Sequence, residues 1–126
     1  MGLMKEVIKE MGNKSREFYE FVLPAIDMHL TDKNLKVIID IPGFSKKDIE
    51  LSLSGDILSI KAEKIMDEKD SKTLISNQRP NKISKKIRLP IEIKEGEEKM
   101  GSAKYENGVL VLVIPVTKKS KNISIE

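Results

Sequence analysis

Alternating apolar and polar positions run through most of this chain and predict a series of short β-strands. From Pro24 onward, apolar side chains recur at every second position, and turn residues separate the alternating segments. Side chains alternate across a strand, so each of these segments has one apolar face. The expected strands contain Ile26, Met28 and Leu30; residues 35–41; Ile49, Leu51 and Leu53; Ile57, Leu58, Ile60 and Ala62; Ile83 and Ile87; and residues 109–114. This rhythm is typical of an all-β sandwich.

The strongest single signal is a hairpin near the end of the chain. Asn107-Gly108 tolerates the positive φ angles of a tight turn, and an aliphatic run, Val109–Ile114, follows it directly. That strand is apolar on both faces, which favours a position in a covered sheet or a sandwich rather than on a wet surface. Pro115 ends it, because proline cannot donate a hydrogen bond to a neighbouring strand.

Residues 1–23 follow a different, helical period. Met4, Val7, Ile8, Met11, Ser15, Phe18 and Val22 fall on one side, and Gly12-Asn13 is a candidate interruption. One interpretation is a helix packed on its own domain. Another is an arm whose apolar face meets other subunits or unfolded chains. A basic membrane-surface helix is disfavoured, because four glutamates dilute the positive face.

Residues 63–81 break the strand rhythm with a long, polar connection. Only Thr73–Ser76 offers a very short strand within it. Connections of this length in compact domains are usually functional, although a disordered solvent loop is the simpler alternative. In the following strand, Lys85 lies on the same side as Ile83 and Ile87, so its charge must find a partner or reach solvent.

Four short motifs, in order along the chain, resemble those of the small heat shock proteins. Ala103, Asn107, Gly108, Val109 and Leu110 match the A-x-x-x-N-G-V-L pattern of the α-crystallin domain. Asp40-Ile41-Pro42-Gly43-Phe44 followed by Ile49, the strand end Leu89-Pro90, and Ile123-Ser124-Ile125 are the other three matches. The resemblance covers about residues 25–126 and is closest to archaeal and prokaryotic members.

The resemblance implies a three-part organisation around an immunoglobulin-like β-sandwich. Residues 1–23 would form a partly helical N-terminal arm, residues 24–115 the α-crystallin domain, and residues 116–126 an extended C-terminal tail with its I-x-I motif. It further implies a homo-oligomer built from dimers, in which a strand around Leu74 and Ile75 pairs with the partner subunit. Arg79 and Lys85 would lie near that interface. The family typically has an arginine where this chain has Lys85, and lysine lacks the planar fork for a bidentate carboxylate contact.

In such an assembly, the tail would link one dimer to another. Ile123 and Ile125 are two residues apart and point the same way in an extended segment. The resemblance places their groove at a sandwich edge of a subunit in another dimer. The groove residues would be Ile49, Leu51, Leu53, Ala103 and Tyr105.

The function that the resemblance implies is an ATP-independent holdase, which binds partly unfolded proteins and prevents their aggregation. A mobile apolar arm and the groove vacated by the tail would cover the clients' exposed apolar surface. The arm residues expected to contact clients are Leu3, Met4, Val7, Ile8, Met11, Phe18, Tyr19, Phe21 and Val22. The alternatives are a non-catalytic, co-chaperone-like sandwich that binds one defined partner, and a nucleic-acid binder.

Composition narrows these possibilities. The chain has 126 residues, no cysteine, a single histidine (His29) and a net charge of +3. A Ser-His or Cys-His catalytic pair therefore has almost no candidate residues. The sequence also has no metal-ligand spacing and no nucleotide-binding glycine motif. The basic strand 82–88 lacks aromatic residues for base stacking. We therefore expect no enzyme activity, no cofactor, no nucleic-acid partner and no membrane as primary partner. Without a signal peptide or an 18-residue apolar run, a cytoplasmic protein is expected. The lysine-rich charge composition without cysteine weakly favours a thermophilic source organism.

Overall fold

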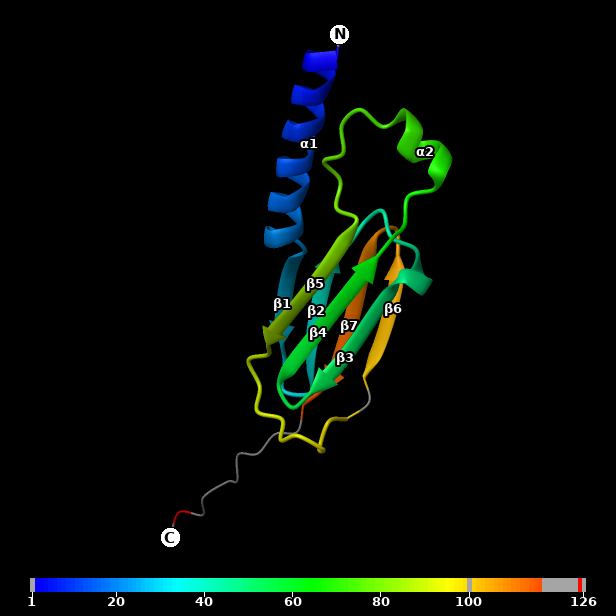
Figure 1. Cartoon of the computed structure of the whole chain (residues 1–126). Helices are drawn as coiled ribbons and strands as arrows, with labels where there is room; N and C mark the ends of the chain where they lie inside the picture. The colour runs from blue at the N-terminus through cyan, green and yellow to red at the C-terminus, as the bar shows by residue number, and fades with distance from the viewer. Residues whose placement is uncertain (1, 100, 117–124, 126) are drawn as a thin grey trace.

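Two antiparallel β-sheets face each other, and an N-terminal helix extends beyond them (Figure 1). The computed structural model describes residues 2–99, 101–116 and 125. The sheets have the strand orders β1-β2-β7-β6 and β3-β4-β5. The elements are α1 (Gly2–Val22), β1 (Ala25–Leu30), β2 (Asn34–Asp40), a 3₁₀ turn (Lys46–Asp48), β3 (Ile49–Ser54), β4 (Ile57–Glu63), α2 (Glu68–Thr73), β5 (Lys82–Arg88), β6 (Ser102–Glu106) and β7 (Val109–Pro115). The predicted all-β sandwich with a helical N-terminal segment is confirmed.

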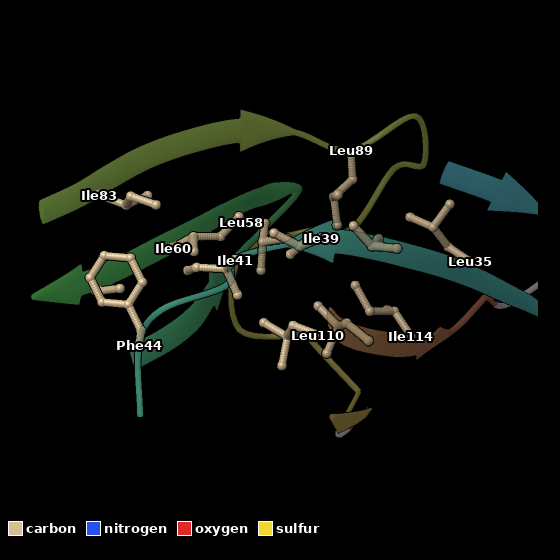
Figure 2. Close-up of a cluster of buried hydrophobic side chains, with 13 residues drawn as sticks. Leu35, Ile39, Ile41, Phe44, Leu58, Ile60, Ile83, Leu89, Leu110 and Ile114 are labelled. Atoms are coloured by element: carbon tan, nitrogen blue, oxygen red, sulfur yellow. The ribbon is translucent and has the colours of Figure 1, made fainter. Parts of the chain in front are cut away.

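The apolar side chains of both sheets meet in one core, as Figure 2 shows. Each sheet contributes the inward half of its alternating strands, for example Leu35, Val37 and Ile39 of β2 and Leu58 and Ile60 of β4. The other buried members are Ile41, Phe44, Ala62, Ile83, Leu89, Leu110, Leu112 and Ile114. Burial of these residues supplies the main free energy that holds the two sheets together.

The hairpin between β6 and β7 forms as predicted. Asn107 and Gly108 have φ angles of 53° and 78°, the positive values of a tight hairpin turn. A side chain at Gly108 would come within 3.0 Å of Pro42, and the Ile41 N–H donates to the Gly108 carbonyl at 2.8 Å. The turn therefore fixes the segment that follows β2 as well as its own two strands.

β7 lies within the sandwich, as predicted, but its two faces are buried unequally. Leu110, Leu112 and Ile114 are buried, but Val109, Val111 and Val113 on the outer face are only half-buried. Polar residues flank the outer valines in register: Asp40 and Glu106 beside Val109, and Lys36 beside Val113. The centre of a four-stranded sheet thus shelters this face in part, without a second covering layer.

The N-terminal helix is continuous, so the predicted interruption at Gly12-Asn13 is wrong. Glycine costs a helix about 1 kcal/mol relative to alanine. Here Gly12 is the only buried residue of α1, and it packs closely against Ser76 and Asn77. A tertiary contact thus accounts for the glycine, and the helix runs through it.

The connection 64–81 contains a short helix that the sequence analysis missed. Asp67 caps α2 by accepting a hydrogen bond from the Asp70 N–H at 2.7 Å. Carboxylates near the start of a helix stabilise it. The cluster of Asp67, Glu68 and Asp70 could therefore have indicated this helix from the sequence. In this single chain the expected strand at Thr73–Ser76 is absent: Thr73 ends α2, and Leu74–Ser76 have no strand structure.

Candidate client-binding and assembly surfaces

The helix α1 exposes its whole apolar face. Nine large apolar side chains of this helix each expose at least 39% of their surface. They are Leu3, Met4, Val7, Ile8, Met11, Phe18, Tyr19, Phe21 and Val22, the same residues that the sequence analysis selected. The structure therefore gathers them on one open surface, which we call the arm face.

Another side of α1 contacts the rest of the molecule. The Glu20 carboxylate accepts hydrogen bonds from the backbone N–H groups of Asn81 and Lys82, both at 2.8 Å. Arg16 pairs with Glu20 at 3.5 Å, and each side chain of this pair exposes less than a quarter of its surface. Gly12 lies one further turn up the same side, against Ser76 and Asn77. Polar contacts thus orient the helix and leave the arm face open.

Lys85 finds its partner at the end of the same helix. Its ammonium group donates to the Phe21 carbonyl and lies 5.1 Å from the centre of the Phe21 ring. The last carbonyls of a helix lack intrahelical partners and carry partial negative charge, which suits a cation. In the single chain, the charge on the apolar side of β5 is thus satisfied by a helix end.

Strands β3 and β6 lie at the same edge of the sandwich (Figure 1). A groove runs between them. Two adjoining hollows of about 260 and 280 Å³ form it, and both are lined by Leu51 and Ala103. Ile49 and Tyr105 line the first, and Leu53 lines the second. All five residues that the resemblance assigned to a tail groove therefore line one or both of these hollows.

Two polar anchors fix the walls of this groove. The Tyr105 hydroxyl lies 2.9 Å from the Ile41 carbonyl and 2.8 Å from the Phe44 carbonyl, and it donates to this pair of acceptors. At the other end, the Glu98 carboxylate accepts from the Gly55 N–H at 2.6 Å. Hydrogen bonds from the backbone N–H groups of Gly55 and Gly96 lower the pKa of Glu98 below its ordinary value of 4.5.

Arg79 lies in a different place from Lys85. Its guanidinium group approaches Gly43, where the ammonium group of Lys64 also lies, 3.5 Å from the Gly43 carbonyl. Burial and the nearby Arg79 charge lower the pKa of Lys64, whose ammonium sits 5.3 Å from the centre of the Phe44 ring. Each of the two proposed interface cations thus contacts a separate segment in the single chain.

The remaining predicted assembly residues are partly or largely exposed, or lie outside the residues that the structure describes. Leu74 is half-buried, and Ile75 exposes 52% of its surface. Ile125 is 98% exposed, and Ile123 lies outside the described residues. Gly12, Arg16 and Glu20 are site residues that the sequence analysis did not select. The spacing of Arg16 and Glu20 signals an i,i+4 ion pair, but their contacts with residues 76–82 have no local signature.

Among residues 2–99, 101–116 and 125, no group of three or more histidine, cysteine or acidic side chains could hold a metal ion. No helix in this described part is long and apolar enough to cross a membrane.

Comparisons with known proteins agree on one family. The sequence pattern of the Hsp20/alpha crystallin family matches residues 27–126. The chain is similar to a crystallised mutant of hsp14.1 from Sulfolobus solfatataricus P2, with 41% identity and a TM-score of 0.73 over 94% of this chain and 96% of that one. It is also similar to heat shock protein 16.0 from Schizosaccharomyces pombe, with 27% identity and a TM-score of 0.62 over 82% of this chain and 75% of that one.

Among curated proteins, small heat shock protein C2 of Rickettsia felis is 28% identical over 87% of this chain and 77% of its own length. Other curated relatives are longer, and the chain spans as little as 25% of the length of one of them. Small heat shock proteins are in general non-enzymatic chaperones that form oligomeric assemblies and act on unfolded proteins. This chain, matched over most of its length, belongs to the Hsp20/alpha crystallin family of small heat shock proteins.

Proposed function

We propose that this protein is an ATP-independent holdase of the cytoplasm, which binds partly unfolded proteins through the arm face and so prevents their aggregation. The observation that carries the proposal is the orientation of α1. Its polar side contacts residues 76–82, while nine large apolar side chains remain exposed on the arm face. An apolar surface of this extent on a soluble chain commonly marks an interaction site.

The proposed mechanism requires no catalytic residue. A protein that begins to unfold exposes apolar segments, which associate with each other and aggregate. The arm face offers competing apolar surface, and its methionines and aromatic rings adapt to varied partners. Met4, Met11 and Phe18 are each at least 60% exposed, so a client can reach them without any opening of the sandwich.

We infer that the functional unit is a dimer formed by exchange of the loop 64–81. No residue between Glu63 and Lys82 is buried, so the loop can leave its own chain without exposing core. The loop strand around Leu74 and Ile75 would add to an open sheet edge of the partner, where backbone hydrogen bonds hold it. Arg79 and Lys85 would then lie near the interface.

We further infer that the tail joins dimers through the groove between β3 and β6. Two fully buried isoleucines, Ile123 and Ile125, would contribute roughly 3–6 kcal/mol before ordering costs. Ordering the preceding linker and losing translational freedom would consume much of this, which leaves a weak contact. Repeated on every subunit, a weak contact can hold a large assembly and still open locally.

The proposal is tested by thermal aggregation of unrelated client proteins in the absence of ATP. Met11→Gln with Phe18→Gln removes apolar surface from the arm face and keeps long side chains that favour a helix. We expect this variant to protect clients several-fold less well than the wild type at equal concentration. Lys9→Gln with Glu17→Gln is the matched control, because it alters two exposed residues of α1 outside the arm face.

The rival functions give different results in the same experiments. Equal protection by both variants, with unchanged assembly size, would exclude the arm face as the client surface. Saturable binding of one protein without broad suppression of aggregation would favour a module with a single defined partner. A steep loss of affinity for nucleic acid with added salt would identify a nucleic-acid binder instead.

A further inference from the structure

A row of residues along α1, next to the arm face, has a specific shape. Gly12, Arg16 and Glu20 follow each other at one-turn intervals, and we call this surface the α1 notch. At its open end, a side chain added to Gly12 would place its Cβ 2.7 Å from Ser76 Oγ and 2.9 Å from the Asn77 N atom. Only glycine allows the loop backbone to approach the helix this closely.

The other end of the notch holds the point where the loop rejoins the sandwich. The Glu20 carboxylate accepts hydrogen bonds from the N–H groups of Asn81 and Lys82, and Lys82 is the first residue of β5. Asn77 lies between the two ends; with its amide oriented to satisfy both atoms, its oxygen accepts from Asn81 Nδ2 at 2.9 Å and from Arg16 Nη1 at 3.3 Å. The notch therefore contacts both the end of the loop, at Asn81 and Lys82, and the segment before it, at Ser76 and Asn77.

The loop has little else to hold it to its own chain. Figure 1 shows it arching away from the sandwich beside α1, with α2 at its outer end. Helix α2 buries no residue, and Ile65 exposes 93% of its surface. No residue of the loop is fully buried, so the loop loses little when it moves to an identical site on another copy, which is the condition for exchange between protomers.

We propose that the α1 notch is a binding surface for the loop of a second copy of this chain. In the exchanged dimer, Ser76 and Asn77 of one chain pack against Gly12 of the other, and Glu20 keeps Asn81 and Lys82 of its own chain in place as the hinge. This inference rests on the loop exchange put forward under the proposed function. It assigns to α1 a second role: the arm face meets clients, and the notch beside it joins the subunits.

A disulfide test exploits the absence of cysteine from the chain. Full-length Gly12→Cys and Ser76→Cys variants are prepared separately, mixed, allowed to exchange subunits and oxidised. Contact in the dimer predicts a covalent dimer that contains one chain of each variant, visible by non-reducing electrophoresis and mass spectrometry. Each variant oxidised alone controls for links between identical cysteines. The chain with both substitutions shows that the two thiols can react.

Two outcomes of the disulfide test would contradict the proposal. A disulfide confined to single chains of the doubly substituted protein, with no mixed dimer, would show that the loop stays on its own helix and would overturn the proposal. Failure to form any link would also overturn it, because the contact seen at Gly12 would then be absent in solution.

A second variant gives an independent measurement. Gly12→Ala should stabilise an isolated helix, because alanine favours helix more than glycine does, yet it places a methyl group against the loop backbone. We expect the dimer of this variant to dissociate about tenfold more readily, as for a modest overpacking of an interface. Gly2→Ala is the control, because Gly2 lies in the same helix with no atom within 4 Å of its Cβ position.

Sedimentation of these variants, with Ile123 and Ile125 replaced by serine to isolate the dimer, measures the effect. An unchanged or tighter Gly12→Ala dimer would contradict the proposal. Client protection by the wild type is measured separately, so a failure of holdase activity is distinguishable from a failure of the notch.

Discussion

The sandwich and the N-terminal helix use apolar side chains in opposite ways. In the sandwich, inward residues such as Ile39 and Ile60 expose none of their surface, and the outward residues are largely polar. In α1 the apolar side is the exposed one, and the polar side contacts the loop through Arg16 and Glu20. Both regions contain many large apolar side chains, but only in the sandwich does the burial of these side chains stabilise the fold.

This difference separates two roles that an apolar side chain can have. Burial in the sandwich contributes folding free energy, whereas exposure on α1 leaves free energy to be gained when another molecule covers the helix. The polar contacts of Glu20 make the arrangement possible, because they hold α1 without using the arm face. A substitution should therefore affect stability in one region and binding in the other.

The largest expected effect is on the core. Ile60→Ala should lower the free energy of unfolding by about 2–5 kcal/mol, because it leaves a cavity between the sheets. Phe18→Ala on the arm face should change it by less than about 0.5 kcal/mol. Urea unfolding followed by β circular dichroism measures both. Equal losses for the two variants would remove the distinction between the regions.

The next effect concerns the loop between β4 and β5, which contacts α1. Replacing residues 67–78 with a short Gly-Ser turn removes Leu74 and Ile75 but no buried residue, so the sandwich should keep its circular dichroism. We expect monomers by analytical ultracentrifugation. Intact dimers of this variant would count against loop exchange.

The tail should affect assembly size but not folding. Ile123→Ser with Ile125→Ser should leave dimers or small species with normal β circular dichroism, because the groove between β3 and β6 loses its ligand. Ser124→Ala is the control, since Ser124 points the other way in an extended segment. Light scattering distinguishes the outcomes. A double variant with the wild-type assembly size would mean that the tail does not join dimers.

The smallest effect is electrostatic and lies at the groove. The pKa of Glu98 is lowered in the folded chain, mainly by the Gly55 N–H, so its carboxylate stabilises the fold above pH 4.5. That contribution is lost as the pH falls through the lowered folded pKa. Glu98→Gln should therefore reduce the urea midpoint slightly at pH 7 and have little effect in strong acid. Glu92→Gln, at an exposed position, serves as control. A difference between Glu98→Gln and the wild type that persists in strong acid would contradict this assignment.

The sequence predicted those parts of the molecule that depend on local pattern. Alternation placed the strands, and Asn107-Gly108 placed the hairpin, because both signals act between near neighbours. The groove residues came from the resemblance, since no local pattern reveals that β3 and β6 lie at the same edge. The arm residues were visible as a helical stripe, but periodicity does not say whether a stripe is covered.

The missed features depend on contacts distant in sequence. Gly12 was interpreted as a helix interruption because its contact, Ser76, lies in the loop after β4. Glu20 binds N–H groups at Asn81 and Lys82, and its own spacing with Arg16 indicates only an ion pair on the helix surface. The orientation of α1, on which the proposed function depends, is set by these distant contacts and has no signature in the local sequence.

Site-specific photo-crosslinking tests the client surface most directly. A photoreactive residue is placed either at Phe18 on the arm face or at its neighbour Glu17, which is exposed outside that face. Each full-length protein is heated with a client and illuminated. We predict strong crosslinks to the unfolding client from position 18 and several-fold weaker ones from position 17. Equal crosslinking from both positions, or none from position 18 while aggregation is suppressed, would contradict the account.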